Sequence, residues 1–141
     1  STFGGNPVAI AAALATMDVL EREGIANAAA MGELFASRLQ HWPAKHPIVG
    51  DVRGRGLMIG VEIVKSQQSR EPAPALRDRI ISLAFEQGLL LLGCGETTIR
   101  LAPPLIINQH EATLGLDIFE HCITQVEQEH AQAVSFASAT V

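Results

Sequence analysis

The chain contains little of what several classes of protein depend on. Its 141 residues include two cysteines, one tryptophan and no tyrosine, and ten lysines and arginines stand against fifteen acids, for a formal net charge of −5. A nucleic-acid partner is not expected, because binding to phosphates needs a basic stripe. The apolar run around residues 89–92 is far too short to cross a bilayer, so no membrane-spanning segment is predicted.

Cysteine and histidine are too few and too scattered to form a disulfide framework or a metal site. Cys94 and Cys122 have apolar neighbours and no ligand-like spacing, which favours a reducing, cytoplasmic compartment. A buried, unreactive thiol is the favoured interpretation of Cys94, with an exposed thiol in a glycine turn as the alternative. None of the five histidines has a carboxylate or cysteine at ligand spacing, so no metal site is predicted.

Lysine is also rare, with Lys45 and Lys65 as its two occurrences. Both lie in polar segments. A lysine that forms a Schiff base needs a dry environment that lowers the pKa of its amine, so neither position suits that role.

Hydrophobic residues make up 48% of the chain and recur at helical spacing in four segments. The predicted helices cover residues 7–22, 25–42, 75–87 and 108–129. Asn6 and Pro7 suit the start of the first, Gly24 predicts a break after it, and Asn108 with Glu111 forms a capping box at the start of the last. Residues 131–141 lose the helical periodicity, so a frayed tail is expected there.

Alternation of apolar and polar residues predicts strands between these helices. Residues 57–63 alternate regularly and follow a glycine-containing turn at residues 53–56. Residues 89–92 are predicted as a short buried strand, residues 93–96 as a turn and residues 98–101 as another strand. The order helix, helix, strand pair, helix, strand pair, helix predicts an α+β fold with a small, mostly antiparallel sheet covered by helices.

Two segments contain residues suited to ligand binding. Hydroxyls and glycines precede the first helix in Ser1-Thr2-Phe3-Gly4-Gly5-Asn6-Pro7, where free backbone N–H groups and hydroxyls can bind a phosphate. A plain helix entry is the alternative. Arg100 stands in an otherwise apolar strand, and its planar guanidinium suits a carboxylate. The alternative is a salt bridge to a structural glutamate within the fold.

Arg53 and Arg55 flank Gly54 in the predicted turn at residues 53–56. A structural or solvated role is predicted for both, through pairing with Asp51 or Glu62 across the turn.

Four motifs in this order resemble the C-terminal part of class-III, fold-type I aminotransferases that use pyridoxal phosphate, with 4-aminobutyrate aminotransferases as the nearest group. The motifs are Ser1-Thr2-Phe3-Gly4-Gly5-Asn6-Pro7, Val52-Arg53-Gly54-Arg55-Gly56-Leu57-Met58, Gly88-Leu89-Leu90 and Ile99-Arg100-Leu101-Ala102-Pro103-Pro104-Leu105. The resemblance covers roughly residues 1–130. It implies that residues 1–24 are a phosphate-binding turn and linking helix, residues 25–130 a small C-terminal domain and residues 131–141 a disordered tail.

The resemblance also implies roles for three residues. Thr2, with Ser1 beside it, matches the residue that binds the cofactor phosphate in the neighbouring subunit of a homodimer, and Arg100 matches the arginine that binds a carboxylate of the amino-acid or 2-oxo-acid substrate. The lysine that tethers the cofactor is expected upstream of Ser1, so the chain alone is expected neither to hold pyridoxal phosphate nor to be active.

The implied reaction is amino transfer from an ω-amino acid such as 4-aminobutyrate to 2-oxoglutarate. Acetylornithine, ornithine and diaminobutyrate enzymes remain alternatives, as does a free-standing α+β module that binds a small carboxylate.

Overall fold

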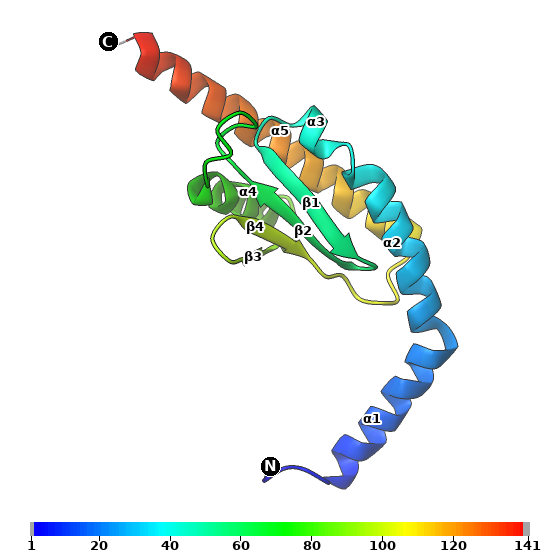
Figure 1. The fold of residues 1–141 in the computed structure, drawn as a ribbon. Coiled ribbons are helices and arrows are strands. Elements are labelled where there is room, and N and C mark those ends of the chain that lie inside the picture. Colours follow the sequence, from blue (N-terminus) through cyan, green and yellow to red (C-terminus); the bar gives the residue numbers. More distant parts are fainter. Residues whose placement is uncertain (1, 140–141) are drawn as a thin grey trace.

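A computed structural model describes the backbone of residues 2–139 and the side chains of residues 2–136. The described part consists of helices, one π-helical turn and a single sheet (Figure 1). In chain order the elements are α1 (Pro7–Val19), the π-helical turn (Leu20–Gly24), α2 (Ile25–Leu39), α3 (Trp42–Lys45), β1 (Val49–Arg55), β2 (Met58–Ile63), α4 (Pro74–Glu86), β3 (Leu92–Cys94), β4 (Thr98–Leu101) and α5 (Gln109–Ala139).

The four strands form an antiparallel sheet in the order β1-β2-β4-β3. Strands β1 and β2 form a hairpin in which Arg53 pairs with Gly60 and Arg55 with Met58. Strand β4 lies on the other side of β2, and its Arg100 stands opposite Gly60 and opposite Leu92 of β3. The predicted α+β class with an antiparallel sheet is confirmed.

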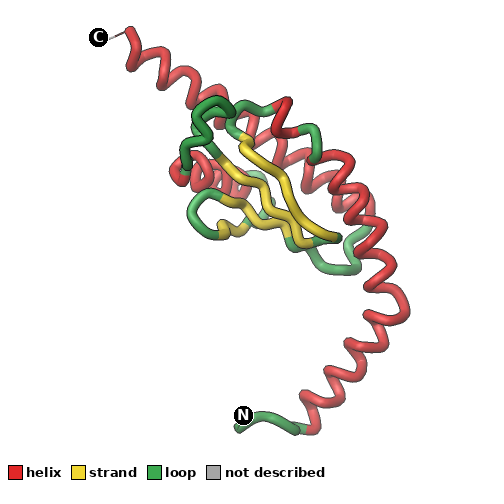
Figure 2. Tube along the Cα trace, in the orientation of Figure 1, coloured by secondary structure: helices red, strands yellow, loops and turns green. Residues whose placement is uncertain are grey.

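One face of the sheet forms the core, because alternate strand residues are apolar and helices pack on that side. Ile59, Val61, Ile63 and Ile99 are buried there. Helix α4 packs on β2, β3 and β4, and α5 packs on α4 and α2. The strands, yellow in Figure 2, therefore lie along one side of the helices.

The first two helices are joined without the break predicted at Gly24. Gly24 has right-handed helical angles (φ −61°, ψ −45°), so the chain passes from α1 into α2 through the π-helical turn. The helix also ends earlier than predicted, at Leu39, and Pro43 lies near the start of the separate helix α3, where its missing N–H costs little. Helix α1 has no buried residue and stands away from the sheet (Figure 1).

The predicted buried strand at residues 89–92 is wrong. Leu90 is 79% exposed and Leu92 is 64% exposed, and strand pairing begins only at Leu92. Gly88 has a positive φ of 84°, and the Leu89 N–H donates to the Ala84 carbonyl, so this part of the chain still completes the end of α4. Cys94, expected to be buried, is exposed on the edge strand β3, whereas Cys122 is buried.

The last helix is longer than predicted. Its capping box is present: the Glu111 N–H donates to Asn108 Oδ1 over 2.9 Å, and the Asn108 N–H donates to Glu111 Oε2 over 3.1 Å. It continues to Ala139, through most of the segment expected to fray, because an alanine-rich stretch extends an existing helix at little cost. Residues 140–141 lie outside the described residues.

The hairpin turn is held against α2 by a close approach of two backbones. A Cβ atom added to Gly32 would lie 2.7 Å from Gly56 Cα and 2.9 Å from the Gly56 carbonyl oxygen. Nearby, the Asn27 side chain donates to the carbonyls of Leu105 and Ile107, over 2.7 and 2.9 Å. Helix α2 thus anchors both the β1–β2 turn and the segment that follows β4.

Replacing Gly32 by alanine is expected to lower the free energy of unfolding by about 1–3 kcal/mol, because the new methyl group forces α2 and the hairpin apart. Gly115→Ala in α5 is the matched control, since its Cβ would meet Leu89 Cδ1 at an ordinary 3.7 Å. The control is expected to gain about 0.5–1 kcal/mol from helix propensity. Urea unfolding followed by circular dichroism measures both, and equal effects of the two substitutions would contradict the close contact.

A buried histidine joins the start of β1 to α5. His46 is 3% exposed, with Nδ1 3.0 Å from Glu127 Oε2 and Nε2 3.5 Å from Glu120 Oε1. Burial lowers the pKa of the imidazole, but the hydrogen bonds and negative charges of Glu127 and Glu120 outweigh it, and the pKa is raised above its usual value. Lys45 also binds Glu120, over 2.8 Å.

The raised pKa predicts that stability falls with increasing pH. Because the folded state holds the His46 proton more tightly than the unfolded state, the contribution is complete below a pH of about 6.5 and is lost as the pH rises through the folded-state pKa. We expect the difference in unfolding free energy between wild type and His46→Gln to shrink with rising pH. His121→Gln, an exposed position on α5, provides the control; a difference that stays constant with pH would contradict a protonated His46.

Candidate functional site

The second face of the sheet is the candidate site. It is opposite the helices, and we call it the open face. Its residues follow from the strand register and the alternation of buried and exposed positions. They are Asp51, Arg53, Arg55, Met58, Gly60, Glu62, Leu92, Cys94, Thr98 and Arg100.

Arg100 is held in the middle of this face by pairing on both sides of β4. Its neighbours in register are Gly60 and Leu92, neither of which carries a charge. The side chain is exposed, and it takes part in none of the hydrogen bonds or ion pairs that the described residues form. Arg100 therefore forms no internal salt bridge with the described residues, which was the alternative considered from the sequence. Its guanidinium remains available to a ligand.

The other arginines of this region are neutralised, with one exception. Arg53 Nη1 lies 3.0 Å from Asp51 Oδ2 and 3.9 Å from Glu62 Oε2, as the sequence predicted. Arg70, from the loop after β2, lies 3.8 Å from Glu62. Arg55 has no carboxylate partner among the described residues, so the pairing expected for it is absent and the solvated alternative holds.

The glycine-rich turn is described from Thr2 onward, and Ser1 lies outside the described residues. Thr2 is exposed, Gly5 has a positive φ of 81°, and Asn6 caps α1 by accepting from the N–H groups of Val8 and Ala9, over 2.9 and 3.3 Å. This turn lies at the far end of α1 from the sheet (Figure 1). One copy of the chain thus does not bring Thr2 and Arg100 together.

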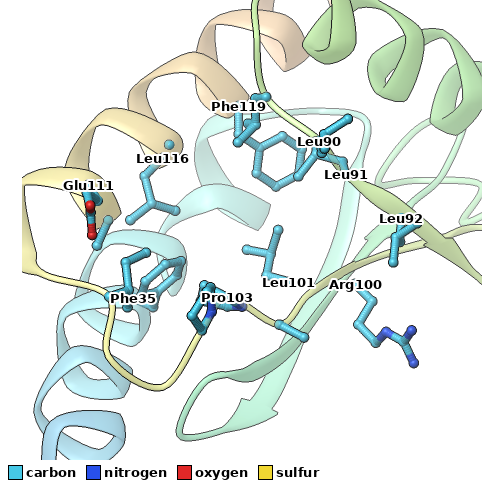
Figure 3. Close-up of a pocket in the computed structure, with 16 residues that line it drawn as sticks. Phe35, Leu90, Leu91, Leu92, Arg100, Leu101, Pro103, Glu111, Leu116 and Phe119 are labelled. Atoms are coloured by element: carbon cyan, nitrogen blue, oxygen red, sulfur yellow. The ribbon is translucent and has the colours of Figure 1, made fainter.

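A largely apolar pocket of about 340 Å³ lies beside β4, between residues 89–92, the loop after β4 and helices α2 and α5. Figure 3 shows Leu101 directed toward Phe35 and Leu116, whereas the Arg100 guanidinium is directed away from them. Arg100 is also among the residues that line the pocket, but its guanidinium points away from these apolar side chains. The open face is therefore where the guanidinium can meet a carboxylate.

The two lysines and the possible metal ligands do not add to this site. Lys45 pairs with Glu120 and Lys65 with Glu71, so neither lysine is free. Within residues 2–136 no three side chains are grouped to hold a metal ion, and no helix in the described part of the chain is long and apolar enough to span a membrane. The sequence did not indicate that Gly60 lies beside Arg100 or that His46 meets two glutamates, because both depend on long-range pairing.

Comparison with known proteins adds a family to this geometry. The sequence model of the class-III aminotransferase family matches residues 1–123 of this chain. A 4-aminobutyrate aminotransferase of Mycobacterium leprae is 44% identical over 125 residues, which cover 86% of this chain and 28% of the relative. An alanine/serine racemase of Pyrococcus horikoshii is 42% identical over 125 residues, covering 86% and 26%. A crystal structure of a Bacillus anthracis aminotransferase superposes with a TM-score of 0.83 at 32% identity, covering 89% of this chain and 30% of that one.

Because the Arg100 side chain forms no hydrogen bond or ion pair with the described residues, we predict that it contributes little to folding. We expect Arg100→Ala to change the free energy of unfolding by less than about 0.5 kcal/mol, because no ion pair is lost. Arg38→Ala is the control, since Arg38 lies 2.8 Å from Asp117 and 3.4 Å from Glu120 and is expected to lose up to about 1 kcal/mol. Thermal and urea unfolding measure both; a loss at Arg100 equal to that at Arg38 would indicate a structural ion pair.

Proposed function

Because the chain belongs to the class-III aminotransferase family, we propose that it forms part of an enzyme that transfers an amino group from an ω-amino acid such as 4-aminobutyrate to 2-oxoglutarate. The chain spans about 28% of the 4-aminobutyrate aminotransferase that it resembles, so the activity belongs to a longer protein or assembly. The observation that carries the proposal is the Arg100 side chain on the open face, which forms no ion pair with the described residues.

Arg100 orients the substrate by binding its carboxylate. A guanidinium presents parallel N–H donors that match the two oxygens of a carboxylate, and such charge-assisted pairs are about twice as strong as neutral hydrogen bonds. Strand pairing on both sides of Arg100 fixes the backbone from which it extends. The bound substrate is thereby held in one orientation, which lowers the barrier to the reaction.

Class-III aminotransferases are pyridoxal-phosphate enzymes, and the cofactor supplies the electron sink for the chemistry. In this chain the exposed hydroxyl of Thr2 and the N–H groups of its turn suit the cofactor phosphate, with Ser1 adjacent. We propose that they serve the active site of the neighbouring subunit in a homodimer, since Thr2 lies far from Arg100 of its own copy.

Both lysines of the chain are tied to glutamates, so we propose that the 141 residues alone neither hold pyridoxal phosphate firmly nor transaminate. We propose a cytoplasmic location for the complete enzyme. The missing chemistry would come from residues beyond these 141.

A second candidate reaction is racemisation of an amino acid. It is favoured by the 42% identity to an alanine/serine racemase. An arginine that holds a carboxylate serves either reaction, because both substrates carry one. The two candidates differ in that amino transfer consumes a 2-oxo acid and racemisation does not.

The test uses the complete gene product that contains these residues. We expect transfer from 4-aminobutyrate to 2-oxoglutarate, and we expect Arg100→Ala to raise the KM for the carboxylate substrates by about tenfold or more, the loss of one charge-assisted pair. Arg22→Ala, which changes an exposed arginine paired with Glu23, is the control. An unchanged KM in Arg100→Ala would overturn the assigned role, and interconversion of alanine enantiomers without amino transfer would favour the racemase.

A further inference from the structure

Strand β3, at one edge of the sheet, has no buried side chain of its own. Its three residues, Leu92, Gly93 and Cys94, are all exposed, and the strand pairs on one side only, with β4. Three residues are at the lower limit of strand length, so backbone pairing alone holds β3 weakly. The position of β3 therefore depends on contacts from outside the sheet.

Arg77 of α4 supplies such a contact. Its Nη1 donates to the Gly95 carbonyl over 2.9 Å, in the turn that joins β3 to β4. The guanidinium also lies over Gly93, because a Cβ added there would be 3.1 Å from Nη1 and 3.4 Å from Cζ. The side chain of Arg77 is 15% exposed, against 41% for Arg79 on the same helix. Arg77 is therefore packed against the β3–β4 hairpin.

The guanidinium of Arg77 is fixed at its other edge as well. Its Nε and Nη2 both lie 2.8 Å from Asp78 Oδ1, which leaves Nη1 directed at the Gly95 carbonyl. Helix α4 is in turn fixed by the core, because its residues Ile80 and Ala84 are fully buried. A firmly packed helix therefore holds the turn through one side chain whose orientation is set.

Strand β3 matters to the open face because of Leu92. Arg100 stands opposite two residues in the sheet, Gly60 on β2 and Leu92 on β3, and of these two only Leu92 has a side chain. Residues that stand opposite each other on one face have Cβ atoms about 5 Å apart, close enough for the apolar stem of an arginine to pack on a leucine. Figure 3 shows Leu92 and Arg100 on neighbouring strands.

An apolar neighbour affects how strongly Arg100 binds an anion. Leu92 limits the directions that the guanidinium can take, so less conformational entropy is lost when a carboxylate is bound. It also excludes water from one side of the guanidinium, and a pair of opposite charges is stronger where water is excluded. If β3 moved away, Arg100 would keep its charge and its backbone pairing with β2 but lose this neighbour. It would then bind a carboxylate more weakly.

We propose that Arg77 is a positioning residue for the carboxylate site: it holds the β3–β4 turn against α4 and thereby keeps Leu92 beside Arg100. Arg77 lies on the side of β3 that faces the helices, since Gly93 alternates with Leu92 and Cys94 along the strand. It therefore acts through the strand and not on the ligand. The inference rests on the carboxylate role proposed for Arg100, and it adds to that site a residue from the opposite side of the sheet.

The experiment compares Arg77→Met with Arg79→Met in the complete gene product. Methionine keeps most of the apolar stem and removes the donors at both positions, but Arg79 donates to Glu129 of α5. Hydrogen–deuterium exchange of residues 92–98 is expected to be about fivefold faster or more in Arg77→Met and unchanged in Arg79→Met. The KM for the carboxylate substrate is expected to rise about threefold or more in Arg77→Met, with kcat unchanged, because only binding is weakened.

Two further variants test the two steps separately. Gly93→Ala pushes the Arg77 guanidinium aside with its new methyl group, so it is expected to speed exchange as Arg77→Met does. Combining the two changes is expected to add nothing, because both remove the same contact. Leu92→Ala, at an exposed position, is expected to raise the KM while the exchange of residues 93–98 stays as in the wild type.

Unchanged exchange in Arg77→Met would overturn the contact, and faster exchange with an unchanged KM would overturn the positioning role. A rise in KM as large in Arg79→Met would also overturn it, since it would reflect a general loss of stability. The KM is measured in whichever reaction the gene product performs, amino transfer or racemisation. Absence of both reactions would overturn the proposed function and the positioning role that rests on it, while exchange would still show whether Arg77 holds the turn. Circular dichroism checks folding, and Arg77→Gln, too short to reach Gly95, repeats the test should the methionine variant misfold.

Discussion

One-sided burial of the sheet is the constraint on which the rest of the structure depends. Ile59, Val61 and Ile63 alternate along β2 and fill the space under α4 and α5, so every intervening residue of that strand must stand on the other side. No helix of the described chain covers that side (Figure 1). Side chains on the open face do not have to pack against the helices of the described chain, so residues suited to ligand binding can occupy these positions.

The sequence predicts the elements well wherever the signal is local. The alternation in residues 57–63 predicted β2, and the Asn108–Glu111 pair predicted the start of α5, because each depends on neighbours within a few residues. Residues 89–92 were mispredicted for a physical reason. The four leucines are as hydrophobic as a buried strand requires. However, the chain leaves α4 at Gly88, which has a positive φ, and needs several residues to reach the edge of the sheet. The Leu89 N–H still donates to the Ala84 carbonyl of the helix.

The candidate site was predictable only in part. Arg100 was evident as a lone charge between apolar residues, whereas its unpaired state depends on the register that places Gly60 and Leu92 beside it. The same limit applies to His46, whose partners Glu120 and Glu127 lie 74 and 81 residues away along the chain. Spacing rules detect ligands that share a turn or a helix face, but not groups that tertiary packing brings together.

The two ends of the proposed active site depend on the fold in different ways. An unpaired arginine in water costs little, since exposed ion pairs contribute only about 0–1 kcal/mol, so the carboxylate end at Arg100 can stay open without weakening the domain. Thr2 is different, because it stands at the end of a helix that has no buried residue. Nothing in the described core fixes the direction of α1, and apolar side chains such as Val8 and Leu14 remain exposed along it. The proposed carboxylate end is therefore formed by the domain itself, whereas no buried contact of α1 in the described chain fixes the position of the proposed phosphate end.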